Sequence, residues 1–161
     1  MLIGIVSDTH DHLDRLRRAL ALCRERGVEL ILHVGDFVSP FTAEPFREVG
    51  LRVVGVFGNN DGDKLYLRER FSEVGELHFG PHELELEGRR VVLLHEPRAL
   101  EALVASGRYD LIAYGHTHRP EVRAGPPVVV NPGECAGWLS GRSTCAMVDL
   151  CTLRAEILDL G

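Results

Sequence analysis

In the first half of the chain, short hydrophobic runs alternate with segments in which hydrophobic residues recur every three or four positions. The runs are rich in β-branched residues and too short for buried helices, so they predict strands. The recurring pattern, clearest around Leu16 and Leu20, predicts helices that bury one face. We expect strands at 2–6, 29–34 and 52–57, and helices at 12–26, 40–49 and 64–71. This alternation is typical of a parallel sheet.

The second half of the chain is richer in hairpins. Residues 83–87 alternate glutamate and leucine, as a strand with one solvent-facing side does. We expect further strands at 90–94, 110–114 and 127–130, a helix at 99–106, and a closing hairpin formed by 144–149 and 153–159. The sequence contains no internal repeat, low-complexity tract or long linker. We therefore expect a single domain over residues 1–161.

Composition narrows the class of partner. The net charge of -6 argues against a surface that coats a long nucleic acid, whereas an acidic cleft would attract divalent cations. No stretch approaches the ~18 apolar residues of a membrane span, and the first hydrophobic run lacks a basic leader. The four cysteines have no C-x-x-C spacing, which indicates free thiols in a reducing compartment. We expect a cytoplasmic protein without a membrane partner, and leave self-association into a homo-oligomer open.

Aspartate, histidine or asparagine follows five of the predicted strands. In open α/β sheets, ligands bind where the strands end at their carboxyl side. These residues are Asp8, His10, Asp36, Asn59, Asp61, His95, His116 and His118. Each has an ordinary interpretation taken alone: Asp8 could cap a helix, and His95 could be a hydrogen-bonded core histidine.

Together these residues indicate a metal site. They would bring carboxylates and neutral imidazoles into one cleft with almost no Lys or Arg to balance the charge. His116 and His118 flank one threonine, so in an extended backbone their side chains point to the same side. Mixed oxygen and nitrogen donors suit Mn²⁺, Fe²⁺, Zn²⁺ or Ni²⁺, and the lack of thiolate argues against structural zinc.

The order of these motifs resembles that of a known family. Asp8-x-His10, Gly35-Asp36, Gly58-Asn59-x-Asp61, His95 and Gly115-His116-x-His118 are similar to the motifs of the calcineurin-like metallophosphoesterases. The chain length and the Asn131-Pro132-Gly133 turn resemble the small YfcE-type phosphodiesterase branch. The resemblance implies an α/β fold, a four-layer αββα sandwich of two mixed sheets, with a two-metal site along one edge.

The resemblance also implies a role for each residue. One metal would be held by Asp8, His10, Asp36 and His118, and the second by Asp36, Asn59, His95 and His116. Asp36 would bridge two divalent transition metals, with Mn preferred and Ni, Fe or Zn as alternatives, and a water between them would attack phosphorus. Asp36, Asn59 and Asp61 would then be the catalytic residues. We expect Asp61 to orient Asn59 or a histidine.

The sequence departs from the family pattern at two positions. Many members have a histidine after the Gly-Asn pair that assists the leaving group, and here Asn60 stands there, which cannot act as a general acid. Substrates with good leaving groups should be favoured. Glu96-Pro97 follows His95 where glycine is usual, and Glu96 could touch the metal or, as we favour, cap the next helix.

Several other residues are candidates near the site. Asn60, Arg119 and Arg142 could meet the substrate. His12 could face the cleft or be a solvated residue of the first helical turn. His33 could support the ligands or be a hydrogen-bonded core histidine.

The candidate ligands and the family resemblance together predict a metal-dependent phosphoesterase. A phosphodiesterase acting on a small soluble phosphodiester or nucleotide is the favoured interpretation. A phosphomonoesterase with the same site, and a non-catalytic metal-binding interaction scaffold of the same fold, are the alternatives. The complete set of candidate ligands favours an enzyme over the scaffold.

Overall fold

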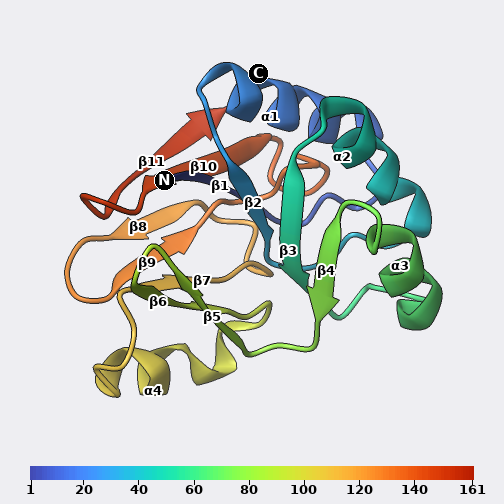
Figure 1. The fold of residues 1–161 in the computed structure, drawn as a ribbon. Helices are drawn as coiled ribbons and strands as arrows, with labels where there is room; N and C mark the ends of the chain where they lie inside the picture. The colour runs from blue at the N-terminus through green and yellow to red at the C-terminus, as the bar shows by residue number, and fades with distance from the viewer.

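Two β-sheets pack face to face between two layers of helices in the computed structural model, which describes residues 1–161 (Figure 1). Helices α1, α2 and α3 cover the outer face of the larger sheet, and α4 covers the outer face of the smaller one. Both sheets contain parallel and antiparallel pairs. The predicted αββα sandwich of two mixed sheets is confirmed.

The six-stranded sheet contains the parallel strands expected in the first half of the chain. Its order is β11-β10-β1-β2-β3-β4, with β1 to β4 parallel and β10 antiparallel to both β1 and β11. Its strands are β1 (Leu2–Val6), β2 (Leu30–His33), β3 (Arg52–Val56), β4 (Gly75–His78), β10 (Thr144–Asp149) and β11 (Arg154–Asp159).

The five-stranded sheet has the order β5-β6-β7-β9-β8. Strands β6, β7 and β9 run parallel, while β5 and β8 close the two edges in antiparallel pairing. Its strands are β5 (His82–Leu86), β6 (Arg89–Leu93), β7 (Leu111–Ala113), β8 (Glu121–Arg123) and β9 (Val128–Asn131).

The local sequence explains where the helices begin and which face they bury. Helix α3 begins after Asp63, whose side chain accepts a hydrogen bond from the Tyr66 N–H at 3.0 Å. Helix α1 buries Leu16 and Leu20, one turn apart on its inner face. The helices are α1 (Leu13–Glu25), α2 (Ala43–Val49), α3 (Lys64–Phe71) and α4 (Leu100–Ala105), with short 3₁₀ turns η1 (Pro40–Thr42) and η2 (Pro97–Ala99).

Three hydrophobic cores fill the three interfaces between the four layers. Along β6, alternate residues point to opposite faces of the sheet. Val91 and Leu93 therefore pack into the core between the sheets, while Val92 packs into the core under α4. The third core joins the larger sheet to its helices and includes Leu16, Leu20, Phe46 and Phe71. The site residues lie at the strand ends that these cores hold in place.

The structure adds two strands to those expected and changes one helix. Strand β4 has one large buried side chain, Leu77, and β8 exposes Val122, so neither gives the hydrophobic pattern of an inner strand. Both lie at sheet edges, where pairing with a neighbouring strand determines the structure. The segment expected to be one helix over 40–49 begins instead as a 3₁₀ turn, with Pro40 at its first position.

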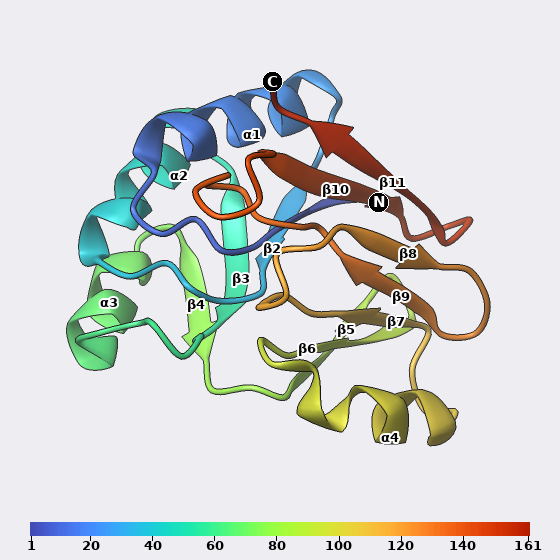
Figure 2. The same ribbon diagram turned by 180° about the vertical axis from the view of Figure 1, so that it is seen from behind.

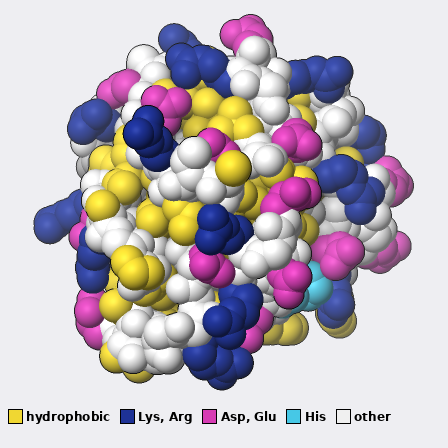
Figure 3. Space-filling model, turned by 60° about the vertical axis from the view of Figure 1, so that its left-hand side comes forward, with side chains coloured by type: hydrophobic (Ala, Val, Ile, Leu, Met, Phe, Trp, Pro, Cys, Tyr) yellow, Lys and Arg dark blue, Asp and Glu magenta, His cyan; other side chains and the backbone are white.

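The surface combines hydrophobic and charged regions. Figure 3 shows hydrophobic side chains gathered in the middle of one face, surrounded by basic and acidic side chains. No helix is long and apolar enough to span a membrane.

Candidate active site

The predicted site residues meet at one edge of the sandwich. They follow β1, β2 and β3 in the larger sheet and β6 and β7 in the smaller one, so both sheets contribute. A loop after β9 lies against the segment after β1 (Figure 2), where the Cys135 and Ala136 N–H groups donate to the Ser7 and Asp8 carbonyls. All seven candidate metal ligands are brought together here, as the distances below show.

The backbone of these strand-end loops is unusual. Asp8, His10, Asp36, His116 and His118 have φ values of 53°, 41°, 60°, 68° and 58°. Residues other than glycine rarely adopt this left-handed region, and each such residue costs on the order of 1–3 kcal/mol when the surroundings impose it. Concentration of such residues at one site is typical of a functional centre.

Two glycines of the motifs are required for close packing rather than for flexibility. A side chain at Gly58 would collide with the Asp36 carboxylate and with its backbone nitrogen. A side chain at Gly115 would collide with the Ser7 hydroxyl and approach Asp8 Oδ2 to 3.0 Å. Both glycines therefore let a neighbouring loop approach a buried carboxylate.

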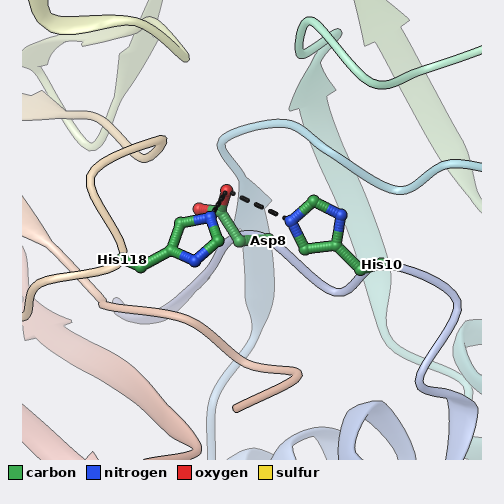
Figure 4. Close-up of side chains that lie close together, drawn as sticks. All are labelled: Asp8, His10 and His118. Atoms are coloured by element: carbon green, nitrogen blue, oxygen red, sulfur yellow. Dashed lines mark ion pairs between the residues drawn. The ribbon is translucent and has the colours of Figure 1, made fainter. Parts of the chain in front are cut away.

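Asp8, His10 and His118 form the first group of candidate metal donors (Figure 4). Asp8 Oδ1 lies 3.1 Å from His118 Nε2 and 3.7 Å from His10 Nε2. Burial would raise the pKa of Asp8, but interactions with His10, His118 and Ser7 hold it well below its usual range. Interaction with the Asp8 carboxylate raises the pKa of both histidines. This group is arranged around an anion that attracts positive charge.

Three buried polar atoms of this group make no hydrogen bond within the protein. They are Asp8 Oδ1, His10 Nε2 and His118 Nδ1. Buried polar atoms without partners are costly, and a bound cation would satisfy the Asp8 oxygen and the His10 nitrogen together. The donor set therefore fits a divalent metal.

Asn59, His95 and His116 form the second group of predicted metal ligands. The amide oxygen of Asn59 lies 2.9 Å from His95 Nε2 and 3.0 Å from His116 Nδ1. On its other side, His95 Nδ1 lies 2.8 Å from the Val34 carbonyl, which can only accept a hydrogen bond. His95 Nδ1 therefore donates to Val34, and Nε2 faces the site.

Asp36 lies between the two groups. Its Oδ2 atom is 3.7 Å from His10 Nε2 and 3.4 Å from His95 Nε2. Burial would raise the pKa of Asp36, but His95 and the Asn60 hydrogen bonds outweigh burial and lower it. Burial would likewise lower the pKa of His95, but the Asp36 carboxylate raises it. Asp36 is thus an ionised carboxylate shared by both donor groups.

Comparison with known proteins agrees with this geometry. The family model for the calcineurin-like phosphoesterase superfamily domain matches residues 1–153. The chain belongs to this superfamily. Its members are metal-dependent phosphoesterases, and the donors assembled at the sheet edge of this phosphoesterase fit a metal.

Characterised relatives of this phosphoesterase include phosphodiesterases. Phosphodiesterase MJ0936 of Methanocaldococcus jannaschii is 36% identical over 154 residues, covering 92% of this chain and 93% of the relative. Phosphodiesterase YfcE of Escherichia coli is 30% identical over 154 residues, covering 83% and 78%. A solved structure described as a novel archaeal phosphodiesterase superposes with a TM-score of 0.91 at 33% identity, covering 99% of each chain.

The structure corrects the expected role of Asp61. Its carboxylate contacts neither the Asn59 side chain nor a histidine. It accepts hydrogen bonds from the backbone N–H groups of Val38 and Gly58, each at 2.7 Å. The buried Asp61 therefore joins the loop after β2 to the loop after β3, and positions Asn59 only through the backbone.

The two arginine candidates lie in different places. Arg119 borders a cavity of about 400 Å³ together with His116 and His118, so it lies beside the predicted ligands. Arg142 is paired instead with Asp159 at 3.1 Å, and the cavity it borders contains none of them. The expectation that Arg142 meets the substrate phosphate is not supported.

Three further candidates are also placed. Glu96 is the N-cap residue of η2, as we favoured, but its carboxylate pairs with Arg98 at 2.7 Å and makes no capping hydrogen bond. His12 stacks on Trp138, with ring centroids 4.4 Å apart, and borders a cavity that contains none of the predicted ligands. His33 is buried, stacks on Phe37 and lies 3.2 Å from the Thr9 hydroxyl, as a core histidine does.

Asn60 lies on the bridging carboxylate. Its backbone N–H donates to Asp36 Oδ1 at 2.9 Å, and its side-chain amide donates to Asp36 Oδ2 at 2.7 Å. Asn60 is also exposed, so one side of it faces the space in front of the site. Asn60 therefore lies beside the predicted metal ligands, and its contact with a substrate stays a prediction.

Two buried residues of the site were not identified from the sequence. Glu134 is fully buried, and its carboxylate accepts hydrogen bonds from the Leu139 and Ser140 N–H groups. The side-chain amide of Asn131 donates to the Gly115 carbonyl at 3.1 Å and holds the turn that carries His116 and His118. The only sequence signal for Glu134 was a charged residue beside the apolar Cys135 and Ala136.

Proposed function

We propose that this protein is a phosphodiesterase that hydrolyses a small soluble phosphodiester with two divalent transition metal ions. One ion would be held by Asp8, His10, Asp36 and His118, and the other by Asp36, Asn59, His95 and His116. Manganese is the favoured metal because imidazole donors suit transition metals better than Mg²⁺.

The position of Asp36 carries this proposal. One ionised carboxylate oxygen lies within 3.7 Å of His10 and 3.4 Å of His95, two histidines that belong to separate donor groups. A carboxylate shared in this way can neutralise part of the charge of two neighbouring cations, the arrangement used for in-line displacement at phosphorus. The relatives named phosphodiesterase support the same reaction class.

The proton on His95 supports the second metal site. With Nδ1 bound to the Val34 carbonyl, Nε2 faces two oxygen acceptors, those of Asn59 and Asp36. In the neutral form with the proton on Nδ1, Nε2 cannot donate to either oxygen, and a bound cation would satisfy all three atoms. Val34 thus fixes the orientation in which His95 presents its lone pair.

Two bound divalent cations would supply an acidified water as the nucleophile and stabilise the charge that develops on the phosphate oxygens. The chain supplies the surrounding groups. Exposed Arg119 lies beside His116 and His118 and can pair with a phosphate oxygen. Asn60 offers an amide that cannot donate an acidic proton, so leaving groups must depart with little help from this position.

A screen of the purified protein tests the proposal. The protein is treated with a chelator and reloaded with Mn²⁺ or Mg²⁺. Hydrolysis of bis(p-nitrophenyl) phosphate and p-nitrophenyl phosphate is then measured with each. We expect no activity in chelator, better recovery with Mn²⁺ than with Mg²⁺, and faster hydrolysis of the diester.

Other outcomes would replace the proposal with a specific alternative. Faster hydrolysis of the monoester would indicate a phosphomonoesterase built on the same site. Metal binding without hydrolysis of any ester would favour a non-catalytic scaffold. Full activity in chelator would contradict a metal mechanism altogether.

A further inference from the structure

A cavity of about 360 Å³ opens directly beside the second donor group. Asn59 and His95 form part of its wall, so it is continuous with the proposed metal site. The rest of the wall comes from residues that follow β3, β4 and β6, and from η2. Ligand pockets in proteins usually measure roughly 300–1,000 Å³, so this volume suits one ring system with its attached sugar or linker.

Two phenylalanines give the cavity its chemical character. Phe57 follows β3 and Phe79 follows β4, and their ring centroids lie 5.1 Å apart at an angle of 53°. Phe57 is almost fully buried, whereas Phe79 is 66% exposed. Phe79 therefore offers accessible aromatic surface in the wall of the cavity.

The charge of the cavity comes from Lys64, the only lysine in the sequence. Its Nζ atom lies 6.0 Å from the centroid of the Phe57 ring and donates a hydrogen bond to the Asp61 carbonyl at 2.6 Å. Lys64 has no acidic partner within ion-pair distance, whereas Arg98 in the same wall is paired with Glu96. Lys64 therefore contributes uncompensated positive charge next to an aromatic surface.

We propose that this cavity binds an aromatic substituent of the phosphoester, such as a nucleobase, against Phe79, while Lys64 attracts the negative charge of the ligand. This assignment rests on the proposed function and specifies its substrate class. A phosphate held at the donor groups would direct one substituent past Asn59 and His95 into the cavity. The cavity beside His116 and Arg119 has no Phe, Tyr or Trp in its wall, so it is suited to a polar substituent.

Binding of two ligands that differ only by a nucleobase tests the proposal. Adenosine 5′-monophosphate and ribose 5-phosphate are titrated into the metal-loaded protein by calorimetry, and their dissociation constants are compared. Stacking of a base on an aromatic side chain is expected to make the nucleotide bind roughly 10-fold more tightly. Phe79→Ala should remove most of this preference and leave the affinity for ribose 5-phosphate unchanged.

Phe41→Ala is the matched control. Phe41 lies in η1, is 71% exposed and lies outside the walls of both cavities. The Phe41→Ala substitution therefore removes a similarly exposed phenylalanine that is not part of the site. This variant should keep the wild-type preference. Phe79→Trp should keep it as well, because it preserves an aromatic surface.

Lys64 provides a second readout that does not depend on activity. Reductive methylation with ¹³C-formaldehyde labels only Lys64 and the N-terminal amine, because the chain has no other lysine. In zinc-loaded protein, the nucleotide should shift the NMR signal of Lys64 but not that of the amino terminus. Ribose 5-phosphate should produce a smaller shift, since it lacks the ring current of a base.

Equal affinity for the two ligands, or an unchanged preference in Phe79→Ala, would overturn the aromatic subsite while hydrolysis of simple diesters continued. Failure of the protein to bind either phosphate or to hydrolyse any ester would instead overturn the proposed function, and the subsite with it. The two failures are therefore distinguishable.

Discussion

The carboxylate of Glu134 lies 3.4 Å from His118 Nδ1, on the side of the ring opposite Asp8. Glu134 is fully buried and is held by two backbone N–H groups of the following loop, so its position is fixed. Burial would raise the pKa of Glu134, but hydrogen bonds from Ser140 and Leu139 and the proximity of His118 lower it. A carboxylate placed behind a metal-binding histidine orients the ring and increases its basicity.

We expect Glu134→Gln to weaken metal binding. The substitution keeps the shape of the side chain but removes its charge, and loss of such partners typically costs about 10–100-fold in metal affinity. Competition of the protein with a chromogenic chelator for Mn²⁺ measures the effect. Glu85→Gln, on the exposed face of β5, is the matched control and should bind metal as the wild type does. Equal affinity in both variants would show that Glu134 has only a structural role.

Asp36→Asn tests whether one carboxylate serves two metals. A neutral amide bridges two cations poorly, so we expect the variant to remain folded and to lose activity by roughly 10²–10³-fold or more. Metal content measured by mass spectrometry should fall from two ions per chain toward one or none. Activity within a few-fold of the wild type, at equal metal content, would contradict the dinuclear site.

Asn60→His tests the missing general acid. In the wild type we expect rates to fall steeply as the pKa of the leaving group rises, because Asn60 cannot donate an acidic proton. A histidine at position 60, beside the Asp36 carboxylate, should flatten that dependence. It should also make the rate depend on pH near the usual imidazole pKa of about 6.5. A general acid contributes about 10²–10⁴-fold, so even a poorly placed one should be measurable on alkyl esters. The measurement is a series of phosphodiesters with graded leaving groups, assayed on both proteins across pH.

A flat dependence in the wild type would mean that another residue supplies the proton. His12 would then be the first to examine, because it lies two residues after His10 and is not one of the predicted metal ligands, although its ring stacks on Trp138.

His33 should make stability depend on pH. Burial lowers the pKa of His33 to about 3, whereas in the unfolded chain it is about 6.5. Below pH 6.5 the unfolded chain therefore binds a proton that the folded protein does not. The free energy of unfolding falls with decreasing pH by up to about 1.4 kcal/mol per pH unit until the pH approaches 3.

Urea unfolding in chelator at pH 5 and pH 7, on wild type and His33→Gln, measures this contribution. The raised pKa values of His10, His95 and His118 stabilise the fold at low pH and so act in the opposite direction. The difference between the two proteins isolates His33, and the variant should lose less stability on acidification. The same pH dependence in both would show that His33 is protonated in the folded protein.

The sequence by itself determined the order of most elements and the identity of the candidate ligands. Hydrophobic runs such as Leu2–Val6 have the length and composition of a strand, and the leucines of α1 have the spacing of a buried helix face, so local pattern was sufficient. The ligands were recognisable because carboxylates and histidines repeatedly followed such strands. Strand β8 was not recognisable in the sequence, because it has only three residues and Val122 stands between two charged ones. Pairing with β9 makes it a strand.

Only the tertiary structure decided what each polar residue contacts. Asp61 and Asp36 lie in similar strand-end loops, yet Asp61 binds two backbone N–H groups while Asp36 lies between two histidines. Glu134, in the loop after β9, lies beside His118, and Phe79, after β4, lines the same cavity as Asn59. These contacts join residues far apart in the chain. The distances between these residues depend on how the two sheets pack and how the loops close over the strand ends. Neither can be predicted from a local sequence pattern.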